Sequence, residues 1–161
     1  MKDLTYTSEH HFTINKGIFL SRVVALPGDR VFVIGGAQNI DGDNACKETF
    51  ELQQGNFVPK ASMWTGRSGF GCAVYPNYSQ IFIAGGSTNK ENTTRHCERY
   101  IVATNTWKRL PELRQSRFQT SMCFFNNGGT LFCFGGMEKK DTHSFAAIDS
   151  IERLSKGQNT W

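Results

Sequence analysis

Two arginines, Arg67 and Arg117, lie 50 residues apart and are the side chains best suited to bind a charged partner. A guanidinium group can hold a carboxylate through two parallel N–H···O bonds, so the pair predicts recognition of an acidic peptide. The alternative role is structural, with each guanidinium donating to main-chain carbonyls. If the arginines bind a partner, Arg67→Ala weakens that binding and leaves folding intact. Loss of the folded state would favour the second. Gly17 takes the equivalent place one period earlier, so the series of arginines is incomplete.

Patterns for catalysis and metal binding are weak. The histidines lack His-x-x-x-His spacing, and consecutive His10 and His11 would face opposite sides of a strand. The segment at 41–44 resembles the start of a calcium loop, but its glycine is misplaced and no glutamate closes the loop, so we expect a turn. Neither a nucleophile elbow nor a phosphate-binding glycine loop occurs. We therefore expect no catalytic residue, no metal and no cofactor.

Composition indicates a globular protein of 161 residues with a net charge of +4. The basic residues are scattered, and the densest cluster is Lys139-Lys140, so nucleic-acid binding is not expected. The chain has no apolar run of about 20 residues, and its first residues are too polar for a signal peptide. Five cysteines, with Cys72, Cys123 and Cys133 interpreted as core residues, predict reduced thiols. We expect a cytoplasmic protein that does not bind membranes.

The elements that must position the arginines repeat along the chain. Glycine pairs end three short apolar runs at intervals of 50 residues, at Gly35-Gly36, Gly85-Gly86 and Gly135-Gly136. The runs are 31–34, 81–84 and 131–134, and they predict strands that are buried on both faces. Other residues keep the spacing, with four extra residues in the third unit: the large aromatics Phe57, Trp107 and Trp161, then Phe50, Tyr100 and Leu154 seven positions before them, and Glu48, Glu98 and Glu152 two positions earlier still. Such a period predicts a repeat architecture.

This pattern resembles the kelch repeat, which runs from an Arg through a strand ending in Gly-Gly to a Glu-x-Tyr strand and a Trp. The second unit matches best, the third has Leu154 in place of Tyr, and the first departs most. The resemblance covers residues 16–161. It implies an all-β fold, a kelch-type β-propeller of about three four-stranded antiparallel blades in an incomplete ring. The glycine pairs are expected to have positive φ at a close approach of backbones, and Trp107 and Trp161 to pack blade against blade.

The period also predicts how the chain is divided. Residues 1–15 fall where the outer strand of a preceding or closing blade belongs, followed by repeats at 16–66, 67–116 and 117–161, the last without most of its outer strand. Because closed propellers have four to eight blades, two interpretations follow. The chain is a fragment with open strand edges, or two copies form a six-bladed dimer in which each N-terminal strand completes the partner's third blade.

The resemblance implies a noncatalytic module that binds a protein or peptide through loops at one end of the ring. These loops are 37–46, 87–96 and 137–149 after the glycine pairs, and 60–68 and 110–117 between blades. The candidate partner-binding residues are Arg67, Ser68, Arg114, Arg117, Asn39 and Asn89. Members of this family select substrates for ubiquitin ligases or dock on the cytoskeleton. The alternative is part of a propeller enzyme, an oxidase or sugar epimerase, whose active site lies in further blades.

Overall fold

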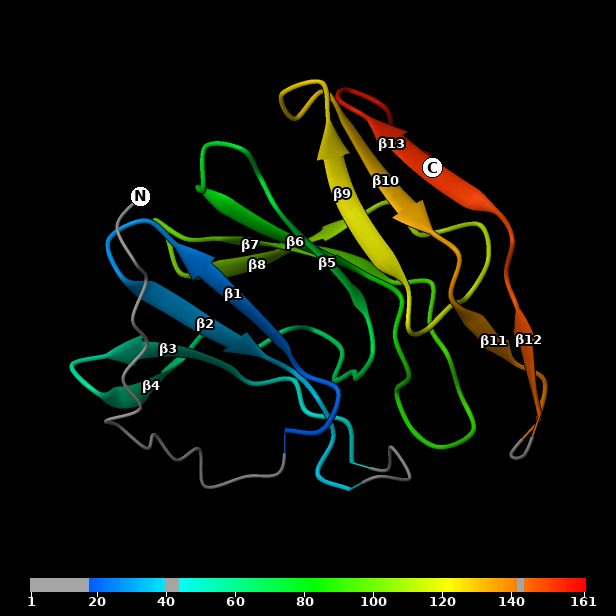
Figure 1. The fold of residues 1–161 in the computed structure, drawn as a ribbon, viewed down its shortest axis with the longest axis horizontal. Helices are drawn as coiled ribbons and strands as arrows, with labels where there is room; N and C mark the ends of the chain where they lie inside the picture. Colours follow the sequence, from blue (N-terminus) through cyan, green and yellow to red (C-terminus); the bar gives the residue numbers. More distant parts are fainter. Residues whose placement is uncertain (1–17, 40–43, 142–143) are drawn as a thin grey trace, which may run out of the picture.

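The computed structural model describes residues 18–39, 44–141 and 144–161, and all of its regular elements are β-strands. Three antiparallel sheets fan out side by side like sectors of a wheel (Figure 1). Blade 1 contains β1–β4, blade 2 contains β5–β8, and blade 3 contains β9, β10 and β13. The architecture is that of a partial kelch-type propeller, and the part of the chain that is described does not close into a ring. The outer strand expected at 1–15 lies outside the described residues.

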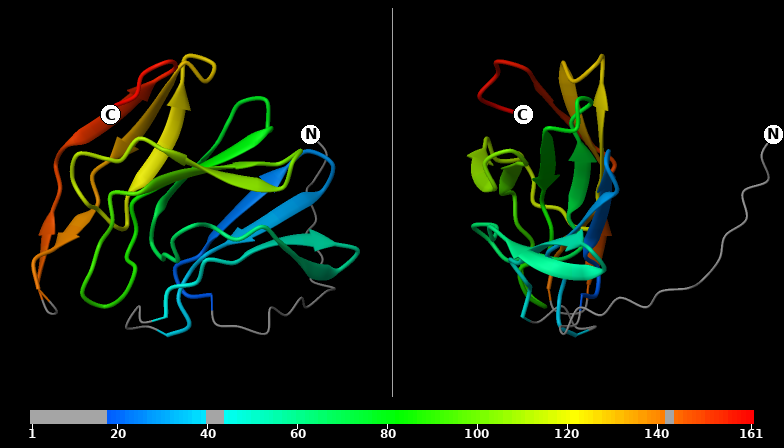
Figure 2. Two further views of the ribbon diagram at one scale, coloured as in Figure 1. Left: turned by 180° about the vertical axis from the view of Figure 1, so that it is seen from behind. Right: turned by 90° about the vertical axis from the view of Figure 1, so that its left-hand side faces the viewer.

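Each blade is a meander in which neighbouring strands are joined by tight turns or by the loop after a glycine pair. The strands of blade 1 are β1 (Arg22–Leu26), β2 (Arg30–Ile34), β3 (Thr49–Gln53) and β4 (Asn56–Lys60). Those of blade 2 are β5 (Gly71–Val74), β6 (Gln80–Ala84), β7 (Cys97–Ile101) and β8 (Thr106–Leu110). Those of blade 3 are β9 (Ser121–Phe125), β10 (Thr130–Phe134) and β13 (Ile151–Ser155). In the side view of Figure 2, β1 and β9 lie along one side of the fan, and β4 and β8 along the other.

The second strand of each blade carries the apolar run that ends in a glycine pair. In β6 the residues from Ile81 to Ala84 are all buried, because blades cover both faces of this sheet. In β10 the prediction of burial on both faces is wrong. Leu131 and Cys133 are buried against blade 2, whereas Phe134 on the opposite face is 37% exposed. For the same reason Cys123, which was expected in the core, is exposed.

Two apolar cores hold the three blades together. The first joins blades 1 and 2 and includes Phe32, whose ring centroid lies 5.8 Å from that of Tyr100. The second joins blades 2 and 3, where Phe82 meets Phe124 edge to face at 5.0 Å. Burial of these aromatic and aliphatic side chains is the main stabilising contribution of each joint.

Backbone hydrogen bonds link the blades where the first strands begin. Gly69 donates to the carbonyl of Leu20, and Gln119 donates to the carbonyl of Gly69. All three residues have positive φ, between 51° and 60°. This short chain of bonds joins equivalent points of the three blades and fixes their relative rotation.

Strand pairing corrects the alignment of the first repeat. Leu52 pairs with Phe57 as Tyr100 pairs with Trp107, so Leu52, and not Phe50, takes the tyrosine position. The cause is the β3–β4 turn, which contains only Gln54 and Gly55, whereas the β7–β8 turn spans 102–105. A fixed sequence spacing cannot detect such a shortening, because the loop before β3 is two residues longer than the loop before β7, so β2 and β4 keep their period while β3 is shifted.

The loop after the third glycine pair contains a hairpin that the sequence did not predict. Its strands are β11 (Met137–Lys139) and β12 (Phe145–Ala147). The Phe145 ring packs against that of Phe118, with centroids 5.5 Å apart. The four extra residues of the third repeat therefore lengthen a hairpin at the loop end of the fan. Nowhere in the described residues is there a helix of the length and apolarity needed to cross a membrane.

Candidate functional site

The Arg67 side chain is fully buried at the start of blade 2. Its Nη1 donates to the carbonyls of Gly85 at 3.1 Å and His96 at 2.6 Å, and its Nη2 donates to Glu98 Oε1 at 2.5 Å. Its Nε donates to the carbonyl of Thr65. Burial lowers the pKa of Arg67 from its ordinary value, and the Glu98 carboxylate opposes that shift. Arg67 therefore joins the ends of β6 and β7 to the linker that precedes it.

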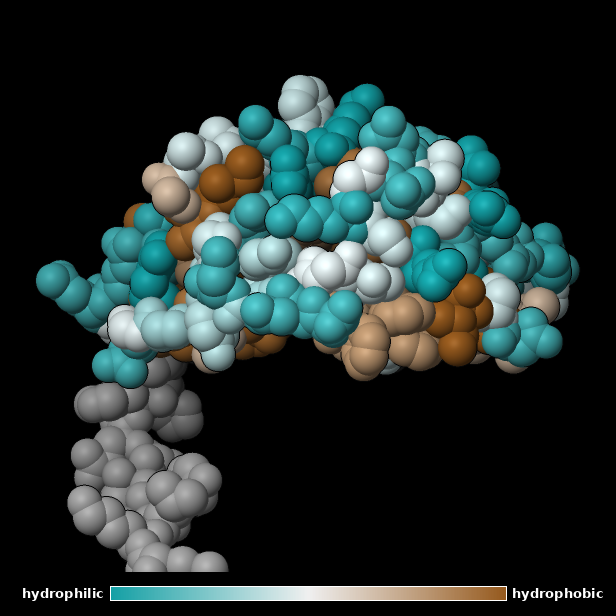
Figure 3. Space-filling view, turned by 90° about the horizontal axis from the view of Figure 1, so that it is seen from above, coloured by the Kyte–Doolittle hydropathy of each residue, from teal (hydrophilic) through white to brown (hydrophobic). Residues whose placement is uncertain are grey.

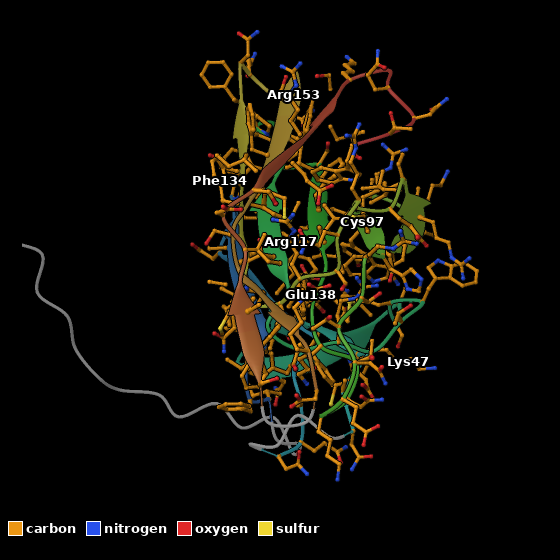
Figure 4. The ribbon with its side chains drawn as sticks, turned by 90° about the vertical axis from the view of Figure 1, so that its right-hand side faces the viewer. Lys47, Cys97, Arg117, Phe134, Glu138 and Arg153 are labelled. Atoms are coloured by element: carbon orange, nitrogen blue, oxygen red, sulfur yellow. The ribbon has the colours of Figure 1, made fainter. Side chains whose placement is uncertain are left out.

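Blade 3 repeats this network. Arg117 Nη1 donates to the carbonyls of Gly135 and Ser150, and its Nη2 donates to Glu152 Oε1 at 2.7 Å. The side chains of Arg117 and Glu152 are 0% and 8% exposed. Figure 4 views the molecule from the side of blade 3, with Phe134 and Arg153 on its strands and Arg117 deeper inside. The guanidinium–carboxylate pair is thus a repeated internal feature of the blades.

The glutamates of these pairs also hold the linkers between blades. Glu98 accepts the backbone N–H of Trp64 at 2.8 Å and that of Thr65. Glu152 accepts the equivalent N–H groups of Arg114 and Gln115. Sequence reasoning used these glutamates only to establish the register. Their repetition together with the arginines was the signal that could have identified the ion pair.

Main-chain carbonyls of the arginines connect neighbouring blades. Gly36 donates to the carbonyl of Arg67 at 2.9 Å, and Gly86 donates to that of Arg117 at 2.8 Å. Both glycine pairs have positive φ, between 56° and 108°, which confirms the expected conformation and close approach. The guanidinium groups act within their own blade, and each arginine bonds to the neighbouring blade through its main-chain carbonyl.

Each repeat tryptophan is packed beneath the preceding linker. Trp107 donates from its indole nitrogen to the carbonyl of Ala61 at 2.9 Å, and Trp161 donates to that of Pro111 at 2.8 Å. Both tryptophans are 6% exposed. This arrangement confirms that they pack blade against blade, with the indole N–H satisfied by the linker.

Five of the six predicted partner-binding residues fall into two groups. Arg67, Ser68 and Arg117 are buried, which fits the structural alternative for the arginines. Binding of a carboxylate by either guanidinium stays a prediction, and it would require local opening of the blade. Asn39 and Arg114 are exposed, in a loop after a glycine pair and in a linker.

Asn89 is half-buried and shapes its own loop. Its side-chain oxygen accepts the N–H groups of Glu91 and Asn92, and its carbonyl accepts a bond from Lys139 Nζ at 2.7 Å. The loops after the second and third glycine pairs are therefore held together. Asn89 lies close to the buried Ser68, because its carbonyl accepts the Ser87 hydroxyl and Ser87 pairs with Ser68.

An exposed tryptophan in the first linker was missed by sequence reasoning. Trp64 is 64% exposed, and the guanidinium of Arg109 lies 5.0 Å from its ring centroid. Trp64 and Arg114 are equivalent, because each donates its backbone N–H to a blade glutamate and a side-chain N–H to the carbonyl of the following tryptophan. We call Trp64, Arg109 and Arg114 the linker surface. Its signal in the sequence was a tryptophan outside the repeat pattern.

Other chemistry is limited in the described part of the chain. All five cysteines are free, and burial raises the pKa of both Cys72 and Cys97 to about 12. Such thiols stay protonated near neutral pH and are poor nucleophiles. No group of three or more His, Cys, Asp or Glu among the described residues is arranged to hold a metal ion.

Blades with this repeated arginine, glutamate, glycine and tryptophan framework define a kelch-type β-propeller. Residues 66–114 match the Kelch motif family. The chain is 26% identical over 132 residues to a RING finger domain and kelch repeat-containing protein of Dictyostelium discoideum, with 81% of this chain covered. It is 30% identical over 135 residues to Kelch-like protein 26 of Mus musculus, with 79% covered, and 25% identical over 164 residues to Alpha-scruin of Limulus polyphemus, with 98% covered.

The chain belongs to the kelch-repeat family. It spans 12%, 21% and 16% of the lengths of these three relatives, respectively. The comparisons therefore concern only a part of much longer proteins.

Proposed function

We propose that this chain is a noncatalytic protein-interaction module that binds a protein or acidic peptide through its linkers and the loops after its glycine pairs. The observation that carries the proposal is the linker surface, where Trp64 is exposed on a linker that Glu98 and Trp107 hold rigidly. Tryptophan and arginine dominate the binding energy of protein interfaces. A rigid scaffold that presents these side chains loses little entropy on binding.

The charge of the linker surface favours an acidic partner. Arg109 and Arg114 form no ion pair within the described residues, and Arg109 stacks on the exposed Trp64 ring. A carboxylate that reaches either guanidinium would form a charge-assisted hydrogen bond. We infer a peptide that combines acidic residues with an apolar side chain for the tryptophan.

Selection of random peptides displayed on phage tests this proposal with the purified full chain. We expect enrichment of acidic sequences, and at least a tenfold loss of their affinity in the double variant Trp64→Ser/Arg114→Ser, as measured by biolayer interferometry. Affinity should also fall when the salt concentration rises, because exposed charges are screened.

The matched control is Tyr78→Ser, which removes a 50% exposed aromatic from a hairpin turn of blade 2. Its affinity for the selected peptides should equal that of the unaltered chain. Selection of peptides without acidic residues, or equal loss of affinity in both variants, would contradict the proposed site.

The biological setting is proposed from the family. One relative's name combines a RING finger domain with kelch repeats, which supports a role in choosing substrates for a ubiquitin ligase. A cytoskeletal scaffold is the second role that the family suggests. We place either role in the cytoplasm, where cysteines such as the five free ones here stay reduced.

We also propose self-association through the exposed face of blade 3. Phe125, Phe134 and Ile151 on this face are 65%, 37% and 58% exposed. Strand pairing makes Phe134 and Ile151 equivalent to Ala84 and Cys97, which are buried between blades 2 and 3. The same surface that accepts a blade inside the molecule is therefore open to a second copy of the chain. Figure 3 shows apolar groups, in brown, at both sides of the fan.

Light scattering of the full chain at micromolar concentration tests this association. We expect a mass of at least two copies, and a shift toward the monomer in Phe125→Ser/Ile151→Ser, because the polar side chains remove much of the apolar face. A monomeric unaltered chain at that concentration would refute the association without affecting the peptide-binding proposal.

A further inference from the structure

A cavity of about 510 Å³ lies between blades 2 and 3, at the hairpin-turn end of the fan. It is remote in the fold from the loops after the glycine pairs. Its walls include the aromatic rings of Tyr75, Phe82 and Phe124 and the side chains of Leu131 and Leu154. The volume falls within the range of about 300–1,000 Å³ that is typical of small-ligand sites.

A departure from the kelch pattern opens this cavity. At the joint of blades 1 and 2, Tyr100 is 1% exposed, contacts the rings of Phe32 and Trp107, and donates its hydroxyl to Asn105. At the next joint, strand pairing puts Leu154 in the tyrosine position. Leucine lacks both the ring and the hydroxyl, so the space that a tyrosine fills in one joint is left open in the other.

A second difference enlarges the same cavity. Strand pairing makes Arg30 of blade 1 equivalent to Gln80 of blade 2, and Arg30 covers the Phe32 ring and binds Glu51. Gln80 is shorter than arginine and lines the cavity. Arg99 also lines the cavity, at the position that Glu51 occupies in blade 1. A closed ion pair at the first joint is thus replaced by an open site with a cation.

The Arg99 side chain in the cavity wall uses only part of its hydrogen-bonding capacity. Arg99 Nη1 donates to Gln80 Oε1 at 3.2 Å, but its buried Nε has no partner. An unpartnered buried donor is costly and points to a ligand acceptor. Lys156 adds a second cation to the lining, whereas none of the described lining residues is Asp or Glu.

We propose that this cavity binds a small aromatic acid, with the ring packed against the Phe82–Phe124 pair in the space beside Leu154 and the carboxylate on Arg99. Aromatic walls favour an aromatic group in edge-to-face or offset packing, and the guanidinium supplies the donors that a carboxylate accepts. The carboxylate comes from a free small molecule or from the C-terminal phenylalanine of a peptide. The site is separate from the linker surface, so it stands whether or not that surface binds a partner.

Phenylacetate is the probe for this site, followed by ¹H–¹⁵N NMR titration of the full chain. We expect saturable shifts for residues around Arg99 and Leu154, and much weaker binding of the neutral phenylacetamide and of cationic benzylamine. Leu154→Tyr, which restores the tyrosine of the second repeat, should reduce the affinity for phenylacetate at least about tenfold by filling the cavity. Arg99→Met should abolish the preference for phenylacetate over phenylacetamide.

The matched control is Arg153→Met, because Arg153 occupies the position of Arg99 in blade 3 but is exposed on the opposite face. Its affinity for phenylacetate should be unchanged. Thermal midpoints of all variants show whether each remains folded. An acetylated tetrapeptide ending in Phe distinguishes the sources: tighter binding than phenylacetate indicates a peptide terminus, and weaker binding indicates a free acid. Equal binding of benzylamine, unchanged affinity in folded Leu154→Tyr, or no saturable shift would overturn the proposal.

Discussion

Arg67→Ala is expected to lower the free energy of unfolding by about 3–5 kcal/mol, which is a large part of the total for a domain of this size. The substitution removes donors to the carbonyls of Gly85 and His96 and leaves Glu98, which is 1% exposed, without its cation. A buried carboxylate without a partner is costly because it has lost its hydration. Urea denaturation followed by tryptophan fluorescence measures the change.

The control is Arg95→Ala, which breaks the exposed pair of Arg95 and Glu112, whose closest atoms are 3.1 Å apart. Exposed pairs contribute about 0–1 kcal/mol, so this variant should unfold close to the unaltered chain. If Arg67→Ala were as stable as Arg95→Ala and lost only peptide binding, the guanidinium would be a binding group and the structural interpretation would be wrong.

The repeat pattern predicted the fold because its residues are the ones that the blades need. Positive φ at Gly85, the ion pair of Arg67 and the indole bond of Trp107 are all requirements of one repeated blade, so their spacing reveals the architecture. The tertiary partners were harder to predict. Whether Arg67 faces a peptide or Glu98 depends on how the linker folds back over the blade, and spacing alone left the two roles open.

The candidate sites lie where the repeat pattern gives no information. Trp64 is outside the kelch signature, and its exposure follows from a linker geometry that only the structure describes. The cavity at Leu154 was visible in the sequence as a missing tyrosine. Its consequence depends on Phe82, Phe124 and Arg99, which come together only when two blades pack. Substitutions at repeat positions are therefore the places where a repeat sequence can best suggest a specific site.

The second large effect is expected for Gly85→Ala, which should destabilise the chain by about 3 kcal/mol. An added Cβ at this position would lie 2.3 Å from the carbonyl oxygen of Arg117, and φ is +68°. The same oxygen accepts the hydrogen bond from the Gly86 N–H. It therefore cannot move without weakening the joint of blades 2 and 3. The midpoint and the slope of urea unfolding give the change in free energy.

Gly135→Ala separates the steric cost of the added Cβ from the cost of positive φ. Gly135 has a similar φ of +50°, but a Cβ added there would lie 3.2 Å from its nearest neighbour, the Ile148 carbonyl oxygen. We expect a loss of about 1 kcal/mol there, which is mainly the cost of the left-handed conformation, because the Ile148 carbonyl needs to shift by only a few tenths of an ångström. The difference between the two variants measures the steric cost of the contact between blades. Equal losses would mean that φ is the only constraint at the glycine pairs, and that the joint tolerates a larger separation than its hydrogen bonds imply.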